Sequence, residues 1–290
     1  MKIAILSGKG GTGKTLLSVN IASCLATMDK QVTYVDCDVE EPNGRIFLKP
    51  ENITNTDVTV KIPTIDKEKC TGCRKCVDFC KFNALALIKN KVLVFDEVCH
   101  ACGGCALVCK ESAVSEKERV IGHIESGNAQ LSSIYNTLLV KTGILNTGEV
   151  SGVPIIRTLL DSVKDDENVI IDCPPGCACI VMESIKDADY CILVSEPTIF
   201  GAHNLSMVYE LVTMFGKKFG VALNKAMDGN NPSEEFCKKH NIDIIGRIPF
   251  DKEMGLLNSN GNVVSMENET YKTYFTNIID NVTKKLGGEK

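Results

Sequence analysis

Residues 8–15 read Gly-Lys-Gly-Gly-Thr-Gly-Lys-Thr, and this stretch decides the fold. It follows a short apolar run at 2–7 and precedes a segment, 15–28, whose apolar residues recur at helical spacing. The pattern G-x-x-x-x-G-K-[ST] between a strand and a helix is typical of a loop that binds nucleotide phosphates. This setting favours a phosphate site over an ordinary glycine turn before a helix.

Each residue type in the loop has a part in phosphate binding. The glycines allow backbone N–H groups to point at the α- and β-phosphates, together with the N-terminus of the following helix. We expect Lys14 to reach the β- and γ-phosphates and the hydroxyl of Thr15 to ligate Mg²⁺. The predicted nucleotide-binding residues of the loop are Gly8, Gly10, Gly11, Thr12, Gly13, Lys14 and Thr15.

Further apolar runs of strand length follow, at 31–36, 168–172, 190–194, 219–223 and 242–246. Helical patterns occur at 152–163, 201–215 and 232–240 and near 270–285. An alternation of strands and helices builds parallel sheets. The sequence therefore predicts a doubly wound α/β domain with a mostly parallel sheet. Residues 119–150 show no clean period and are left without an assignment.

Composition narrows the functional class. The chain has 290 residues, 44% of them apolar and 24% charged, with a net charge of -5, which excludes disorder and disfavours a nucleic-acid partner. The N-terminus runs directly into a strand-like segment, and no apolar stretch approaches the ~18 residues that span a bilayer. We expect a cytoplasmic protein without a membrane partner. Its 15 cysteines then indicate metal or redox chemistry rather than disulfides.

Eight of the cysteines form two runs, each with the pattern C-x₂-C-x₂-C-x₃-C-K, about 29 residues apart. This is the bacterial ferredoxin spacing for two [4Fe–4S] clusters, in which the fourth cysteine of each run ligates the other cluster. Cluster one is predicted to bind Cys70, Cys73, Cys76 and Cys109. Cluster two is predicted to bind Cys99, Cys102, Cys105 and Cys80. A zinc site is the alternative, but zinc usually separates its cysteine pairs by a longer loop.

The cysteine runs define an inserted small α+β domain of ferredoxin type. It is predicted to span 61–118 and to contain a pair of strands at 84–88 and 92–95, while 1–60 and 119–290 form the nucleotide-binding domain. The proline that usually follows each fourth cysteine is replaced by Lys81 and Lys110, and this change removes no ligand. His100 lies inside the second run, where no ligand is missing, so we expect a surface residue.

The loop form GKGGTGKT, with the extra lysine Lys9, resembles the deviant Walker A motif of the MinD-like ATPases. That superfamily includes partitioning ATPases, the nitrogenase iron protein and Mrp-type iron–sulfur ATPases, and some members carry an inserted ferredoxin domain. The resemblance extends to 36–38 and 172–176. It implies that Lys9 crosses a homodimer interface to the partner's nucleotide, that Asp172 holds Mg²⁺ through water and that Asp38 orients the attacking water. Asp36 is a further candidate for the Mg²⁺ site; helix capping or turn formation is the alternative for these aspartates.

Asn224 follows another strand and begins the sequence Asn-Lys-Ala-Met-Asp. A guanine site would need the aspartate one residue earlier. The resemblance implies that Asn224 contacts adenine and that the segment 248–250, including Pro249, walls the base. We therefore expect ATP as the nucleotide, with a simple turn at Asn224 as the alternative.

Two functional hypotheses follow from the resemblance. In the first, ATP binding and hydrolysis change the geometry of a homodimer and gate electron transfer from the clusters to an unidentified redox partner. In the second, nucleotide turnover drives assembly or insertion of a metallocofactor into an unidentified metalloprotein. Cys177 and Cys179, just after the second switch, could bind a further cluster or metal between subunits, as similar cysteines do in the nitrogenase iron protein; ordinary buried thiols are the alternative.

Overall fold

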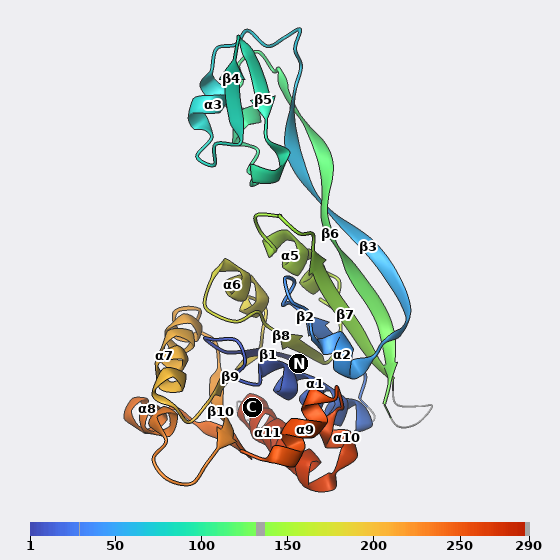
Figure 1. Ribbon diagram of the computed structural model, residues 1–290, viewed down its shortest axis with the longest axis vertical. Coiled ribbons are helices and arrows are strands. Elements are labelled where there is room, and N and C mark those ends of the chain that lie inside the picture. Colours follow the sequence, from blue (N-terminus) through green and yellow to red (C-terminus); the bar gives the residue numbers. More distant parts are fainter. Residues whose placement is uncertain (29, 132–136, 288–290) are drawn as a thin grey trace.

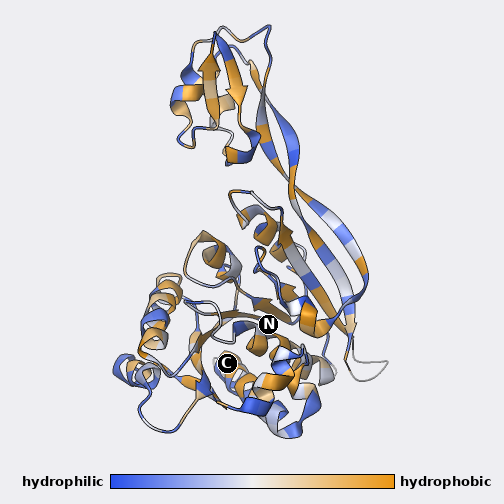
Figure 2. Cartoon of the chain, in the orientation of Figure 1, coloured by the Kyte–Doolittle hydropathy of each residue, from blue (hydrophilic) through white to orange (hydrophobic). Residues whose placement is uncertain are grey.

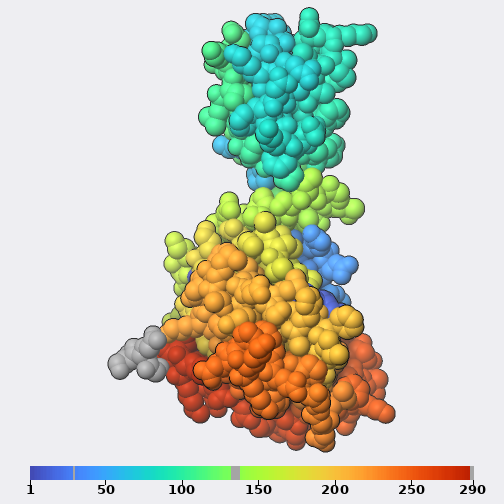
Figure 3. Space-filling model, turned by 90° about the vertical axis from the view of Figure 1, so that its left-hand side faces the viewer, coloured from blue at the N-terminus to red at the C-terminus, as the bar shows by residue number. Residues whose placement is uncertain are grey.

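The computed structural model describes residues 1–28, 30–131 and 137–287. Figure 1 shows a large body, a smaller cysteine-rich head and a long two-stranded ribbon that joins them. We use "head" for residues 66–113 and "ribbon" for the two strands on either side of it. Figure 3 shows that the molecule narrows between the head and the body.

Within the described residues, nine strands form the sheet of the body and the ribbon. They are β1 (Lys2–Leu6), β2 (Thr33–Asp36), β3 (Glu51–Ile65), β6 (Val114–Gln130), β7 (Thr137–Leu145), β8 (Val169–Asp172), β9 (Tyr190–Ser195), β10 (Phe219–Ala226) and β11 (Ile244–Pro249). Their order is β11-β10-β9-β1-β8-β2-β7-β6-β3. Pairing is parallel from β11 to β7 and antiparallel from β7 to β3, so the predicted mostly parallel α/β fold is confirmed.

Helices cover both faces of this sheet (Figure 1). One face carries α1 (Lys14–Thr27), α2 (Gly44–Leu48), α9 (Lys252–Ser259), α10 (Val264–Glu267) and α11 (Glu269–Gly287). The other carries α5 (Val153–Asp161), α6 (Cys179–Ile185), α7 (Ile199–Met214) and α8 (Pro232–His240). Along β1, Ile3 and Ile5 join the core under the first group, whereas Ala4 and Leu6 join the core under the second. Burial on both faces explains why the central strands are continuously apolar (Figure 2).

The ribbon consists of β3 and β6, paired antiparallel from Glu51 opposite Asn128 to Ile65 opposite Val114. Only the lower part of β6, from Gly122 onward, also pairs with β7. The segment 119–150, left unassigned above, therefore contains β7 and most of β6. Its strands escaped the pattern because buried, half-buried and exposed residues mix along β6 without a regular alternation. The predicted domain boundaries 61 and 118 fall within these two strands.

The head contains α3 (Lys75–Phe79), α4 (Gly104–Leu107), a 3₁₀ turn at Asp96–Val98 and the strands β4 (Leu85–Ile88) and β5 (Lys91–Val94). The two strands form the expected antiparallel pair. Their connection places Lys89 and Asn90 at φ 48° and 60°, and two positive φ values are typical of a tight hairpin turn. Each short helix begins just after the second cysteine of a run.

Candidate nucleotide site and cysteine cavities

The phosphate loop lies between the end of β1 and the start of α1. Gly11 and Gly13 have φ values of 79° and 95°, the left-handed region that favours glycine. A Cβ atom at Gly13 would also lie 2.0 Å from Nδ2 of Asn224. Both backbone conformation and space therefore require glycine at position 13.

Lys14 is buried at the centre of the site between two carboxylates. Its Nζ lies 3.3 Å from Oδ1 of Asp172 and 3.8 Å from Oδ2 of Asp38. Burial alone would lower the pKa of Lys14, but the two carboxylates outweigh it and the pKa is raised. Burial raises the pKa of Asp38 to about 6, against the opposing effect of Lys14. The structure thus brings together the lysine and the two aspartates that the sequence singled out.

Asp36 is fully buried and is held by backbone groups. Its carboxylate accepts hydrogen bonds from the backbone N–H of Asp38 at 3.1 Å and of Gly44 at 2.9 Å. Burial, together with the charge of Asp172, raises its pKa to about 8. These contacts suit the turn-forming alternative, since Asp36 organises the backbone that carries Asp38.

Tyr34 is a site residue that sequence reasoning missed. Its hydroxyl donates to Oδ2 of Asp172 at 3.0 Å. It lies on β2 next to β8, so its side chain fixes the second oxygen of the carboxylate whose first oxygen faces Lys14. Because Tyr34 lies within an apolar run, the sequence indicates only that it belongs to a buried strand.

Asn224 lies at the end of β10 and contacts the phosphate loop directly. Its Nδ2 donates to the carbonyl of Thr12 at 2.8 Å. The following Lys225 donates to the carbonyl of Gly11 at 3.1 Å and pairs with Glu196. Neither Lys225 nor Glu196 was predicted from the sequence. The adenine contact of Asn224 stays a prediction.

Pro249 ends β11 beside the end of β10, opposite Ala226. The next residue, Phe250, donates its backbone N–H to Ala226 and leaves its ring exposed. The two strand ends therefore place Pro249 at the same edge of the sheet as the phosphate loop. Its role as a wall for the base stays a prediction.

Lys9 and Thr15 occupy different positions in the loop. Thr15, at the start of α1, is half-buried, whereas Lys9 is exposed and has no ion pair within the described residues. The hydroxyl of Ser7 donates to the carbonyl of Lys9 at 2.8 Å and fixes its backbone. The side chain of Lys9 is thus free to reach a neighbouring molecule.

The predicted second switch, 172–176, lies in the segment that connects β8 to α6. Gly176 has a φ of 95° and donates its N–H to the carbonyl of Ser7 at 2.9 Å, which joins this segment to the phosphate loop. Cys177 is half-buried against the core, while Cys179 is exposed at the first position of α6. Burial of Cys177 fits the ordinary alternative for that thiol, whereas Cys179 is open to a ligand.

Two cavities in the head are lined by four cysteines each. One is lined by Cys70, Cys73, Cys76 and Cys109. The other is lined by Cys80, Cys99, Cys102 and Cys105. The grouping is that of the crossed ligation, in which the last cysteine of each run belongs to the other cluster.

The backbone around the two cavities repeats with the sequence. Gly72 and Ala101, Arg74 and Gly103, and Asn83 and Ser112 are equivalent positions in the two runs. All six have positive φ, between 48° and 70°. Alternation of such residues with residues of negative φ turns neighbouring backbone N–H groups toward a common point, which suits an anionic group. The backbone supports an internal duplication.

The chemistry of the cavities fits an iron–sulfur cluster. Burial raises the pKa of Cys76, and the neighbouring Cys70 and Cys109 add to the rise. Among the described residues, no three His, Cys, Asp or Glu side chains are arranged to hold a single metal ion. The four cysteines that line each cavity match the number of ligands of a [4Fe–4S] cluster.

The ribbon orders the cavities by distance from the body. The cavity of cluster one includes Ile65 and Val114 at the head end of the ribbon. The cavity of cluster two includes Lys61, Pro63 and Glu116, nearer to the body. The cavity lined by Cys99 is therefore the inner one and the cavity lined by Cys70 the outer one.

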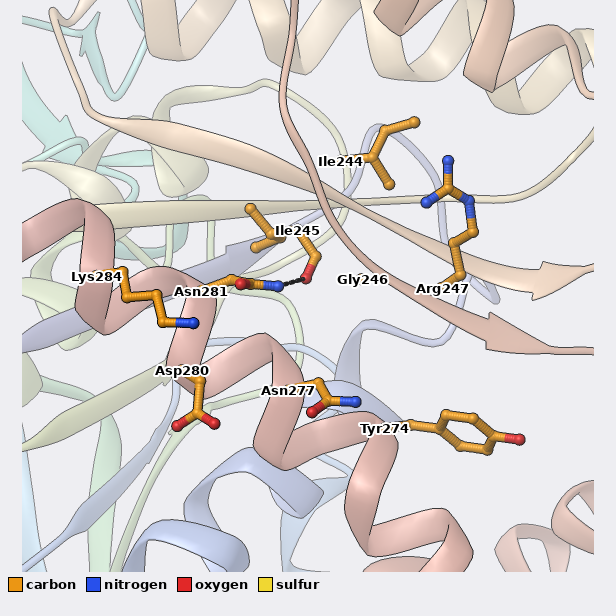
Figure 4. Close-up of a pocket in the computed structure, with 9 residues that line it drawn as sticks. All are labelled: Ile244, Ile245, Gly246, Arg247, Tyr274, Asn277, Asp280, Asn281 and Lys284. Carbon is orange, nitrogen blue, oxygen red and sulfur yellow. Dashed lines mark hydrogen bonds between the residues drawn. The ribbon is translucent and has the colours of Figure 1, made fainter.

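A separate hollow lies between the edge strand β11 and the helix α11 (Figure 4). Asn281 of α11 donates to the carbonyl of Ile245 at 2.9 Å, which partners one backbone group of this edge strand. None of the predicted site residues lines this hollow. In the part of the chain that the structure describes, no helix combines the length and the apolar character that a bilayer crossing requires.

The loop between β1 and α1, Lys14 within it and Asp172 at the end of β8 define a P-loop ATPase of the ParA/MinD type. The chain belongs to the family described as "AAA domain", whose profile matches residues 1–228. An uncharacterized protein of Methanocaldococcus jannaschii is 30% identical over 277 residues, which cover 94% of this chain and 95% of that protein. The iron-sulfur cluster carrier protein of the same organism is 24% identical over 308 residues, which cover 100% of this chain and 86% of that one.

Solved structures share the fold. The cell division ATPase MinD of Pyrococcus furiosus has a TM-score of 0.61 at 17% identity, with 98% of each chain covered. MinD of Pyrococcus horikoshii, complexed with Mg-ADP, also has a TM-score of 0.61 at 17% identity, with 100% of this chain and 98% of that chain covered. At this identity the likeness shows the MinD-like α/β fold alone.

Proposed function

We propose that this ATPase couples a nucleotide-driven dimer switch to electron transfer through two [4Fe–4S] clusters. The observation that carries the proposal is the pair of four-cysteine cavities in the head, which the ribbon joins to the body (Figure 1), with Cys99 of the inner cavity also lining the cleft toward the body. When bound, the clusters supply one-electron transfer at low potential. Because each cavity takes cysteines from both runs, the clusters are resident cofactors built into the fold of the head.

At the nucleotide site, the chain's own residues position and neutralise phosphate. Lys14, which faces Asp172 and Asp38 in this structure, turns to the β- and γ-phosphates when Mg-ATP binds. Asp172 then holds the water shell of Mg²⁺ beside Thr15, and Asp38 accepts a hydrogen bond from the attacking water. The exposed Lys9 reaches the nucleotide of a second copy, so hydrolysis requires the homodimer.

A carrier function is the second candidate. Relatives named iron-sulfur cluster carrier protein cover the whole chain or most of it, and the exposed Cys179 lies directly after the second switch. Two copies of this segment could hold a labile cluster or metal ion as cargo. Such a site would open or close with the nucleotide, because the switch is bonded to the phosphate loop through Gly176.

Anaerobic purification followed by iron analysis and electron paramagnetic resonance tests the main proposal. We expect about eight iron atoms per chain, as two cubanes require. The midpoint potential of the clusters should change when Mg-ATP binds. Cys80→Ser should damage chiefly cluster two, although Cys80 lies in the first run. Stoichiometric zinc without a reducible cluster would exclude the electron-transfer function.

The double variant Cys177→Ser, Cys179→Ser tests the carrier candidate. If a bridging site exists, the variant should lose the metal that the parent protein holds beyond the roughly eight iron atoms per chain expected in the two cavities of the head, while the head clusters survive. ATP-dependent release of iron to an apo-protein should disappear with it. Unchanged metal content and release would rule out a bridging site.

A further inference from the structure

A cleft of about 380 Å³ lies where the head meets the body. One wall is the loop Cys99–Ala101, which belongs to the inner cysteine cavity, and the other is the segment 149–154 with Arg157. The floor is the neck of the ribbon, with Val60 and Arg119 among its residues. The cleft is thus the place where the body, the ribbon and the loop of the inner cysteine cavity face one another.

A two-pronged ion pair fixes the neck to the body side of this cleft. Nη1 and Nη2 of Arg119, on β6, each lie 2.7 Å from an oxygen of Glu149. The side chains are only 18% and 10% exposed, so the pair is shielded from solvent. Glu149 lies in the short segment that leads from β7 into α5. The orientation of the neck therefore depends on where α5 begins.

A second two-pronged pair joins α5 to α6. Nε of Arg157 lies 3.0 Å from Oε1 of Glu183, and Nη2 lies 3.3 Å from Oε2. The hydrogen bond from Arg157 lowers the pKa of Glu183, so the carboxylate stays ionised. Two hydrogen bonds fix both the distance and the angle of a pair, which a single charge contact does not.

The helix α6 is itself continuous with the second switch. It starts at Cys179, and Gly176 just before it is bonded to the phosphate loop. A change of nucleotide that moves the switch must shift the first turn of α6, and Glu183 lies one turn further on. A chain of contacts therefore runs from the nucleotide through α6, Arg157, α5, Glu149 and Arg119 to the neck.

We propose that Arg157 and Arg119 are positioning residues that transmit the nucleotide state to the junction beside cluster two. The inference rests on the proposed function, since it names how the same clusters are regulated. The alternative is that both pairs only hold the body together. An exposed ion pair typically stabilises a fold by less than ~1 kcal/mol, so losing the Arg157 pair should leave the protein folded while breaking the linkage.

The test compares full-length Arg157→Gln with the charge reversal Arg157→Glu, Glu183→Arg. Arg247→Gln is the matched control, because Arg247 forms an exposed pair with Glu234 at 3.1 Å on the far edge of the sheet. Two quantities are measured with and without Mg-ATP: hydrogen exchange over 99–101 and 146–152, and the midpoint potential of the clusters. Iron content and ATP hydrolysis report whether each variant is intact.

We expect nucleotide to change both quantities in the parent protein and in Arg247→Gln. In Arg157→Gln the nucleotide-linked change in exchange should shrink about fivefold or more, with iron content and hydrolysis retained, and the charge reversal should restore it. An undiminished response in Arg157→Gln, or a reversal that restores nothing, overturns the linkage and leaves the proposed function standing. If exchange at the cleft responds in the parent while the potential does not, the linkage stands and the electron-transfer function fails. A parent protein that shows neither response overturns both.

Discussion

The body and the head are held together by different means. The body buries strands such as β1 and β9 on both faces and has two extensive apolar cores. In the head, the buried apolar side chains within the described residues are Cys76, Ala84, Leu85 and Ala113. Large side chains such as Phe79 and Leu107 are 46% and 87% exposed there. The body buries enough apolar surface to fold by burial, whereas on the proposed function the head gains its stability from the clusters that its cysteines bind.

Iron removal should give the largest effect, because it acts on the head alone. We expect the iron-free protein to lose amide protection throughout 66–113, since no apolar core remains to hold the backbone. The central strands of the body should keep exchange slowed by about a thousandfold or more. Hydrogen exchange read by mass spectrometry measures both regions in one sample. Full protection of the iron-free head would mean that the ribbon and the β4–β5 pair suffice to fold it.

The same difference explains what the sequence could predict. Strands β1 and β8 are predictable from the sequence because burial on both faces requires continuous apolar runs. The grouping of the cysteines into two cavities was predictable because the spacing of the two runs is typical of [4Fe–4S] ferredoxins. The ribbon was not predictable from the sequence. Its two strands pair only with each other above Gly122, so no neighbouring layer requires a regular apolar pattern there.

Within the site, residues that act through long-range contacts were the ones missed. Tyr34 and Glu196 meet their partners only after folding, and no local pattern marks them. The sequence also could not decide between the two roles considered for Asp36. An acidic residue at the end of a strand suits the formation of a turn as well as the binding of Mg²⁺. The contact between Arg119 and Glu149 joins positions 30 residues apart and follows from the topology alone.

Lys14→Ala should give the next largest effect, confined to the body. Removing the buried Lys14 side chain leaves Asp172 and Asp38 facing each other and removes the charge that meets the phosphates. We expect ATP hydrolysis to fall by about a hundredfold or more, with weakened nucleotide binding and unchanged iron content. Steady-state hydrolysis, nucleotide titration and iron analysis measure the three.

Lys9→Ala is the matched variant for Lys14→Ala, since both remove one lysine from the same loop. Because Lys9 is exposed, binding of ATP by its own subunit should stay nearly normal. Dimer formation with ATP and hydrolysis should be lost, as light scattering and activity would report. Normal dimerisation and hydrolysis in Lys9→Ala would contradict the role of Lys9 across the interface.

The pH dependence of hydrolysis should follow Asp38. Its pKa is raised to about 6, mainly by burial, and orienting water requires the ionised form. The value of kcat/KM, which reports the free enzyme, should therefore fall as pH drops through about 6, approaching tenfold per unit below it. Cluster absorbance over the same range serves as the control for the head. A flat profile between about pH 5 and 7 would show that Asp38 is not the group required in ionised form.

Gly13→Ala should give the smallest effect, and Gly10→Ala is its matched control. Position 13 combines a φ of 95° with a Cβ site 2.0 Å from Nδ2 of Asn224, whereas a Cβ at Gly10 meets nothing within 4 Å. The left-handed backbone alone should destabilise the Gly13→Ala variant by about 1–2 kcal/mol, and the displaced Asn224 would loosen the loop further. Gly10→Ala should change the free energy of unfolding by less than about 0.5 kcal/mol. Urea unfolding followed by a probe in the body gives both values, and the head clusters should stay intact in both variants until the body unfolds. Equal stabilities would show that the loop relaxes around an added methyl group and that its geometry is set by the nucleotide.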